Sequence, residues 1–329
     1  GKVPFEQVWG WLVDESLLPG LPYEHVQLEH RTGGYISDLQ MQLAALSGEW
    51  KLGQFIDIDD DQAKEDLRRL SAGVLSIVAQ SARGADLPPV SEATVAEGQT
   101  AAERFLLEWR GEVNETHAKA IDTYWICTAE HGLNASTFAA RIAASTGADC
   151  GAALSSAVGA LSGPLHGGAP ARVLHMIEDV ERTVDAEGYV KSVLDRGDRL
   201  MGFGHRVYRA EDPRARVLRR TAKELGAPRY EVALALENAA LTELRVRRPD
   251  RVLETNVEFW AAIVLDFAQI PAEITPSMFT CARTAGWAAH ILEQKLTGRL
   301  VRPSARYVGP SARPVRDVPG AAEVLDRPV

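Results

Sequence analysis

Apolar residues recur three and four positions apart along most of this chain. In residues 64–82, for example, Leu67, Leu70, Val74 and Ile77 fall on one face of a helix. Runs that alternate apolar and polar residues with a period of two are scarce, and strands and helices do not alternate along the chain. The sequence therefore predicts an all-α fold. Similar helical spacing, with many Ala residues that permit close packing, is found in segments 101–110, 118–128, 151–161, 215–225, 231–245 and 280–296.

The charge balance narrows the partners that the chain can bind. Among 329 residues, 36 are Lys or Arg and 45 are Asp or Glu, so the formal net charge is −9 at pH 7. A field of this sign repels nucleic acids and anionic membranes, and an anionic ligand then needs a local basic pocket. The most apolar run, 259–265, ends at Asp266 and is far shorter than the ~20 residues of a membrane span. We expect a soluble protein with no nucleic-acid or membrane partner.

Cysteine usage favours a reducing compartment. Cys127, Cys150 and Cys281 lie far apart and form no C-x-x-C pair, which argues against a disulfide framework and a structural zinc site. The chain starts with Gly and no signal-like segment follows, so its targeting cannot be read. A cytoplasmic location is the default expectation.

Two segments are expected to lead into helix N-termini. Asp212-Pro213 has the pattern of an N-cap followed by proline at the first helical position, and Pro170 opens a helix expected over 171–181. From about Arg302 onward the chain is rich in Pro, Gly and Arg. This composition predicts an extended surface arm rather than another packed helix.

Four short segments are unusual in a helical protein: EHGLN at 130–134, GPLHGG at 163–168, GFGHRVYR at 202–209 and NVE at 256–258. Three of them place a histidine beside a glycine, which allows sharp turns and lets a ligand approach the backbone. A neutral imidazole near a helix N-terminus can donate a hydrogen bond to developing negative charge. Each histidine taken alone fits a surface or capping role as well. The signatures of P-loop, dinucleotide-binding, zinc-protease and serine-hydrolase sites are absent.

Three charged residues are candidates for the same site. Arg214 falls in the first turn of an expected helix, where the helix dipole disfavours a cation unless an anion is near. Arg283 falls among small and apolar helix residues, where burial is costly unless it binds a carboxylate. Glu258 begins an apolar run, where desolvation would raise its pKa towards that of a general base. Chance placement of Arg214, and exposure of Arg283 and Glu258, fit the pattern as well.

Taken in order, these segments resemble the citrate synthase family. The motifs that carry the resemblance are GPLHGG around His166, MGFGHRVY followed by DPR at 212–214, NVE at 256–258, and R-T-A-G-W-x-A-H starting at Arg283. The likeness extends from the opening segment to about Gly309.

The resemblance implies two helical domains with the active site in the cleft between them. The larger domain would comprise residues 1–165 and 261–329, and the smaller one residues 166–260. It also implies a homodimer in which Arg302 reaches the active site of the neighbouring subunit.

The activity implied by the resemblance is condensation of acetyl-CoA with oxaloacetate to give citrate and CoA, a step of the tricarboxylic acid cycle. By position, His166 would stabilise the enol of acetyl-CoA, His205 would polarise the oxaloacetate carbonyl, and Glu258 would abstract the methyl proton. Acetyl-CoA would be a co-substrate, and no resident cofactor or metal is implied. Oxaloacetate would be held by His131, Asn134, Arg214, Arg283 and Arg302, and CoA by Met201, Gly202, Phe203, Gly204, Arg209 and Asn256.

One position departs from the family pattern, because Glu258 stands where the family usually has Asp. The additional methylene could displace the carboxylate by more than ~1 Å, which costs about a hundredfold in rate if nothing compensates. Three alternatives therefore stay open. They are a 2-methylcitrate synthase using propionyl-CoA, a non-catalytic protein that binds acyl-CoA or oxaloacetate, and a purely structural helical dimer. The choice between the two acyl-CoAs depends on room for one methyl group, worth only ~1 to 3 kcal/mol.

Overall fold

The computed structural model describes residues 2–29, 31–164, 166–167 and 169–325. Within these residues the chain is all-α: it has no β-strand, and the single β-bridge joins Phe203 to Thr255. The all-α prediction is therefore confirmed. The α-helices are α1 (Phe5–Asp14), α2 (Tyr35–Glu49), α3 (Asp60–Arg83), α4 (Glu92–Val95), α5 (Ala101–Arg110), α6 (Glu115–Thr128), α7 (Ala135–Ser145), α8 (Cys150–Leu161), α9 (Ala169–Thr183), α10 (Ala186–Asp195), α11 (Pro213–Glu224), α12 (Tyr230–Arg247), α13 (Val257–Phe267), α14 (Thr275–Thr297) and α15 (Ala321–Leu325), with 3-10 turns η1 (Ala272–Ile274) and η2 (Val315–Asp317).

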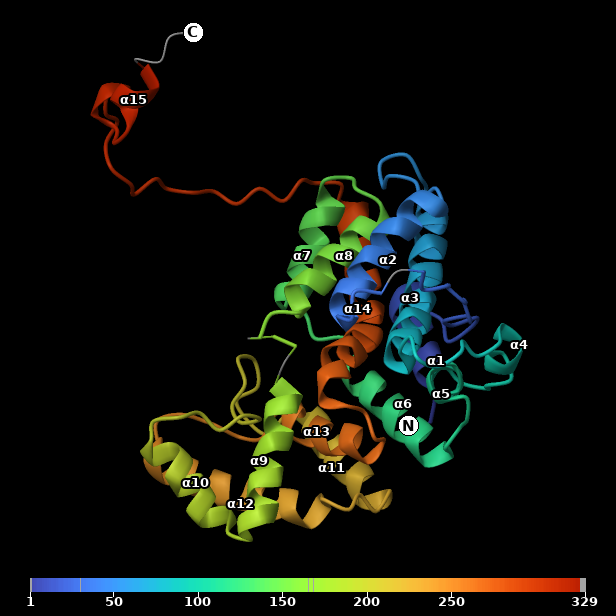
Figure 1. The fold of residues 1–329 in the computed structure, drawn as a ribbon, viewed down its shortest axis with the longest axis vertical. Coiled ribbons are helices and arrows are strands. Elements are labelled where there is room, and N and C mark those ends of the chain that lie inside the picture. The colour runs from blue at the N-terminus through green and yellow to red at the C-terminus, as the bar shows by residue number, and fades with distance from the viewer. Residues whose placement is uncertain (1, 30, 165, 168, 326–329) are drawn as a thin grey trace.

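The helices form two groups (Figure 1). In the first group, helices α1, α2, α3, α6, α7 and α8 pack against the long helix α14, and α4 and α5 lie outside them. Helices α9 to α13 form the second group. Helix α6 joins them, because it packs against α14 in the first group and against α11 and α13 in the second. The expected domain boundary at residue 260 falls inside α13, and the division into two domains stays a prediction.

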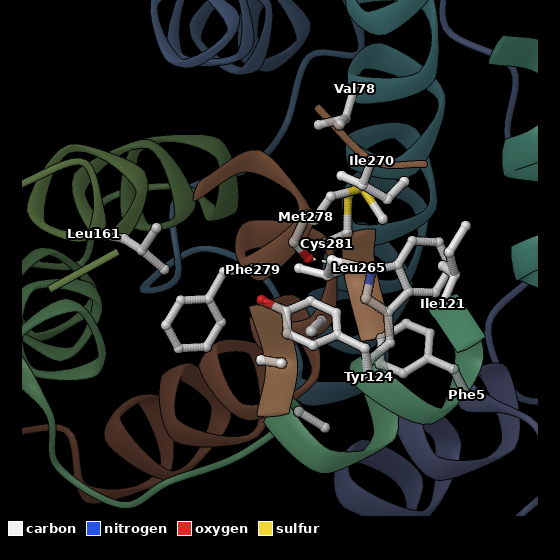
Figure 2. Packing of buried hydrophobic residues seen from close by; sticks show 14 of the residues in the cluster. Phe5, Val78, Ile121, Tyr124, Leu161, Leu265, Ile270, Met278, Phe279 and Cys281 are labelled. Carbon is white, nitrogen blue, oxygen red and sulfur yellow. Dashed lines mark hydrogen bonds between the residues drawn. The ribbon is translucent and has the colours of Figure 1, made fainter. Parts of the chain in front are cut away.

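Aromatic packing fixes α1, α6 and α14 against one another. The rings of Phe5 and Trp125 lie 5.4 Å apart, and the Trp125 indole N–H donates to the carbonyl of Met278 at 3.1 Å. Figure 2 shows Tyr124 in the same cluster, between the residues of α14 and Phe5. Each large apolar side chain fully buried here contributes about 1.5 to 3 kcal/mol. Helices α6 and α14 are therefore fixed against each other by a packed core.

The chain after α14 leaves the body. Gly298 ends the helix in the left-handed conformation (φ 60°), and the Val301 N–H donates to Ser145 Oγ at 3.0 Å. Beyond this point the chain is extended and exposed as far as η2 and α15 (Figure 1). The arm predicted from about Arg302 is thus confirmed, with a short helix at its end that the composition does not indicate.

Two further expectations concern the setting of the protein. No helix in the described part of the chain is long and apolar enough to cross a bilayer. All three cysteines lie in that part, and none of them forms a disulfide. The cytoplasmic location stays a prediction.

Candidate active site

The candidate residues of the catalytic and oxaloacetate site, Arg302 apart, come from six places in the fold. His131 and Asn134 lie in the turn between α6 and α7, and His166 lies just before α9. His205 lies between α10 and α11. The charged candidates occupy helices, since Arg214 and Glu258 lie in the first turns of α11 and α13 and Arg283 lies in the middle of α14.

His131 and His205 meet across the two groups of helices, with their Nε2 atoms 3.1 Å apart. His205 Nδ1 accepts the backbone N–H groups of Val207 and Tyr208, each at 3.0 Å, so the ring hydrogen of His205 is on Nε2. Burial and the charge of Arg214 lower the pKa of both rings, to about 4 for His131. Both imidazoles are neutral at pH 7. The cause is burial and a nearby cation, and not the helix N-terminus that the sequence suggests.

His166 is held through a serine that the sequence analysis did not identify. Its Nε2 lies 2.9 Å from Ser136 Oγ, which also receives the indole N–H of Trp287 at 3.2 Å. Ser136 in turn lies 2.8 Å from the side-chain oxygen of Asn134. Burial and the charge of Arg283 lower the pKa of His166, so this ring is neutral as well. The signal for Ser136 in the sequence is only its place two residues after Asn134.

The guanidinium of Arg214 is already paired with a carboxylate. This carboxylate belongs to Asp212, the N-cap residue of α11. The fully buried Asp212 accepts from Arg214 Nε at 3.0 Å and Nη2 at 2.7 Å, and from the backbone N–H groups of Arg214 and Val257. Burial would raise the pKa of Asp212, but these hydrogen bonds and the Arg214 charge lower it below its usual value. The expectation that Arg214 awaits an external anion is thus incomplete, because Asp212 partly neutralises it and joins α11 to α13.

A short backbone pairing positions the start of α13. The Gly204 N–H donates to Glu254 O at 2.7 Å, and the Asn256 N–H donates to Gly202 O at 2.9 Å. Both glycines have φ above 80°, and a Cβ at Gly202 would clash with Phe259. The Asn256 side chain caps α13 by accepting the Glu258 N–H, and it donates to Gly204 O. The pairing therefore fixes Glu258 relative to the His205 loop.

Glu258 has the electrostatic character of a base. Burial raises its pKa to about 7, against the lowering effect of the Arg214 and Arg283 charges. Its side chain is partly buried and makes no hydrogen bond to any other described residue. At neutral pH it therefore exists in both protonation states and can accept a proton.

Arg283 is a buried cation that has no carboxylate partner. Its side chain is 1% exposed, and its Nε donates to the Thr128 carbonyl at 2.8 Å. The guanidinium lies 4.6 Å from the centre of the Phe279 ring. No carboxylate of the described residues comes within 4 Å of it, and burial lowers its pKa to about 10. An arginine in this state is suited to bind a carboxylate of a ligand.

The residues expected to bind CoA lie beside two arginine-lined hollows. One, of about 660 Å³, is bounded by Phe203, Gly204, His205 and Arg209 together with Arg206 and Arg251. The other, of about 500 Å³, shares Phe203 and Arg251 and adds Arg199, Arg247 and Arg248. From the sequence alone, the arginines that line these hollows beside Arg209 could not be assigned to a site, because runs of arginine most often lie on a solvated surface.

Arg302 lies apart from the other candidate residues. It is exposed at the start of the arm, and no hydrogen bond or ion pair joins it to another described residue.

Comparisons with known proteins identify the family to which the chain is similar. The family model described as "Citrate synthase, C-terminal domain" matches residues 22–304. A Mycobacterium tuberculosis protein named "Putative citrate synthase 2" is 59% identical over 325 residues, 98% of this chain and 87% of the relative. The 2-methylcitrate synthase of Shewanella oneidensis is 39% identical over 204 residues, 60% of this chain and 52% of the relative.

A solved structure shares the fold. It is the ternary complex of carboxymethyl coenzyme A and oxaloacetate with citrate synthase from Thermoplasma acidophilum, with a TM-score of 0.80 at 23% identity over 95% of this chain and 87% of that one. The family model covers most of the chain, and the mycobacterial relative is aligned along nearly all of it. The chain belongs to the citrate synthase family, whose members are acyltransferase enzymes.

Proposed function

We propose that this enzyme condenses oxaloacetate with acetyl-CoA and releases citrate and CoA. The observation that carries the proposal is the buried guanidinium of Arg283, which has no carboxylate partner among the described residues and lies near Glu258 and neutral histidines. An unpaired buried cation costs several kcal/mol, so such a residue is retained where a ligand supplies the anion.

Oxaloacetate supplies two carboxylates and a ketone carbonyl. Arg283 would take one carboxylate through its terminal nitrogens, and Arg214 would take the other while Asp212 holds its guanidinium in place. His131 and Asn134 line the same space. His205 would donate its Nε2 hydrogen to the ketone oxygen, displacing the contact that it makes with His131.

The methyl protons of acetyl-CoA are very weakly acidic, so base and hydrogen-bond donor must act together. Glu258 would remove the proton, and its pKa of about 7 makes it a stronger base than an ordinary carboxylate near ~4.3. His166 would donate to the enolate oxygen. In the structure the Ser136 hydroxyl donates to Asn134 Oδ1. The proposed role requires this hydroxyl to turn and donate to His166 Nε2 instead, which leaves the ring hydrogen of His166 on Nδ1.

The enolate carbon would then attack the ketone carbon of oxaloacetate, and the new carbon–carbon bond forms while His205 passes its proton to the ketone oxygen. Water would next attack the thioester carbonyl and return a proton to His205. The acyl carbon–sulfur bond then breaks, and the departing sulfur takes the proton held by Glu258, so that CoA leaves as the thiol and both residues are restored. Closing one group of helices over the other would keep water out of the first step.

The arginine-lined hollows support CoA as the carrier. CoA carries several phosphate charges, and the two hollows offer five arginines beside Arg209 along one path from Phe203. The Thermoplasma structure contains a CoA derivative and oxaloacetate, which agrees with this pair of ligands.

We also propose a homodimer in which Arg302 completes the site of the partner copy. The arm carries exposed apolar residues, among them Leu300, Tyr307 and Val308, that nothing in its own body covers within the described part of the chain. A second copy of the chain is the occupant that such an arm fits, and Arg302 would add a third guanidinium for a dianionic substrate.

Release of free thiol from acetyl-CoA tests the proposal directly. We expect release by the wild-type enzyme that depends strictly on oxaloacetate. Thermal stabilisation by oxaloacetate and acetyl-CoA without any thiol release would contradict the catalytic proposal and leave a non-catalytic binding protein. No stabilisation by either ligand would leave only a structural dimer.

The second candidate activity is 2-methylcitrate synthesis from propionyl-CoA, which the Shewanella relative favours. The same assay with propionyl-CoA decides between them. The proposal expects kcat/KM to be higher for acetyl-CoA, and a preference for propionyl-CoA would replace it by the second candidate.

A further inference from the structure

The carboxylate of Glu130 lies in the turn that carries His131 and Asn134. Glu130, two residues after the end of α6, accepts the Gly132 N–H through Oε1. Gly132 has φ 57°, and its carbonyl accepts the Asn134 N–H at 2.9 Å and the Asn134 side-chain amide at 3.2 Å. The Glu130 carboxylate therefore ties together both ends of the turn between α6 and α7.

A histidine from α14 holds this carboxylate from the other side. His290 Nε2 lies 3.1 Å from Glu130 Oε1, and His290 Nδ1 lies 3.0 Å from Arg141 Nη1. Arginine can only donate, so Nδ1 accepts and the ring hydrogen is on Nε2, directed at Glu130. Glu293, paired with Arg141 at 2.8 Å, is the other charged group that faces this ring. The tautomer of His290 is thus fixed for holding Glu130.

The second oxygen of Glu130 packs on α14, the helix that carries Arg283. Oε2 is buried without a hydrogen-bond partner among the described residues and packs on Gly286, where any Cβ would clash with it. Arg283 lies one turn away on the same face of α14, and its charge helps to lower the pKa of Glu130. In return, Glu130 is the first charge that opposes the effect of burial on Arg283.

We propose that Glu130 is a positioning residue for the oxaloacetate site. One oxygen sets the turn that presents His131 and Asn134, and the other adds a buried negative charge beside α14 that offsets part of the cost of burying the Arg283 charge. Glu130 does not touch the substrate. This inference rests on the proposed function, because it assigns a role within the oxaloacetate site.

The test replaces the carboxylate by its isosteric amide. Glu130→Gln keeps an oxygen for Gly132 and His290 but removes the negative charge beside α14. We expect the KM and the dissociation constant for oxaloacetate to rise about tenfold, while the KM for acetyl-CoA and the melting temperature stay near wild-type values. Glu130→Asp, which restores the charge, should recover part of the loss. Glu187→Gln, the same change on an exposed face of α10, should have no effect.

Coupling to His290 gives a second readout. If the two residues act as one unit, Glu130→Gln combined with His290→Ala should be little worse than the more impaired of the two single variants. Additive losses would contradict a shared role.

The binding measurement separates the two levels of the proposal. Wild-type protein that binds no oxaloacetate would overturn the proposed function and this inference with it. Wild-type protein that binds oxaloacetate, with Glu130→Gln binding it equally well, would overturn this inference alone. This inference would also be overturned if Glu130→Gln lost binding of both substrates and melted at a lower temperature, because Glu130 would then have only a structural role.

Discussion

At the scale of single residues, the site is built from groups held in states that water would not favour. Glu258 is a carboxyl with a pKa near 7, Arg283 is a buried arginine with no carboxylate partner among the described residues, and three histidines are kept neutral. Burial is the first cause of each state. A nearby arginine adds to its effect on the pKa of the histidines and opposes its effect on the pKa of Glu258. Such groups destabilise the empty site, and a dianionic substrate relieves them.

The pH dependence of the rate reports the state of Glu258. A base must be ionised to take a proton, so kcat/KM for acetyl-CoA should rise with pH through about 7 and level off above it. An ordinary glutamate would titrate near ~4.3 and give no change in this range. Steady-state rates at saturating oxaloacetate between about pH 5.5 and pH 9 measure this, and a flat profile would contradict the assignment.

Binding of a substrate carboxylate by Arg283 is expected to require the planar guanidinium group. Arg283→Lys keeps the charge but loses the Nε bond to Thr128 and the paired terminal nitrogens. We expect the KM for oxaloacetate to rise roughly 10- to 100-fold, with a smaller change for acetyl-CoA. Arg182→Lys, on an exposed face of α9, is the control. Equal KM values for Arg283→Lys and wild type would show that no carboxylate binds there.

Prediction from sequence is most specific at this scale where a residue type is rare in its context. An arginine among small residues and a glutamate before an apolar run were singled out in this way, and the structure shows that Arg283 is buried and that Glu258 is desolvated. Ser136 and the role of Glu130 were not predicted, because a serine or glutamate near a helix end is common and their contacts with Trp287 and His290 join residues distant in the chain.

At the scale of elements, the site depends on how helix starts are joined. Asp212 caps α11, neutralises Arg214 and receives the first N–H of α13, so one carboxylate fixes two helices that each carry a candidate residue. Helices with a clear apolar stripe or proline start, such as α3 and α11, were found from sequence close to their bounds. The helices that were not predicted are α1, α2, α4, α7, α10, α13 and α15. In α7 the Ala-rich sequence has few large apolar residues to mark a face.

Replacing Asp212 tests this junction. Asp212→Asn leaves an amide facing the donors of Arg214 or Val257, which should cost about 2 to 3 kcal/mol in the free energy of unfolding. Because the pKa of Asp212 is lowered by folding, its contribution is present at neutral pH and is lost as the pH falls through the folded-state pKa. Urea unfolding should therefore show a wild-type advantage at pH 7 that shrinks below about pH 4. A constant difference would contradict the role of the charge.

At the scale of the whole molecule, the candidate site draws residues from both groups of helices. Helix α6 packs against both groups, and its C-terminal end carries the turn with His131. The arm, in contrast, leaves its own body and takes Arg302 with it (Figure 1). Sequence composition predicted the arm, since Pro and Gly exclude regular helix, but no local pattern shows which copy of the chain it serves.

Mixing two impaired variants tests whether Arg302 acts in the partner copy. Arg302→Gln and Arg283→Lys should each be strongly impaired alone. In a mixed dimer, one site combines the intact Arg283 of one copy with the intact Arg302 of the other, so an equal mixture should regain about a quarter of wild-type activity. If Arg302 serves its own copy, every site in the mixture stays defective and no activity returns.

The central claim is that Glu258 is the base of an oxaloacetate-dependent condensation. The most direct measurement is thiol release from acetyl-CoA by wild type and by Glu258→Gln, with oxaloacetate binding measured for both. We predict strictly oxaloacetate-dependent release by the wild type and a loss of roughly 100- to 10,000-fold in the variant, with oxaloacetate binding retained. Release by Glu258→Gln at the wild-type rate would contradict the claim.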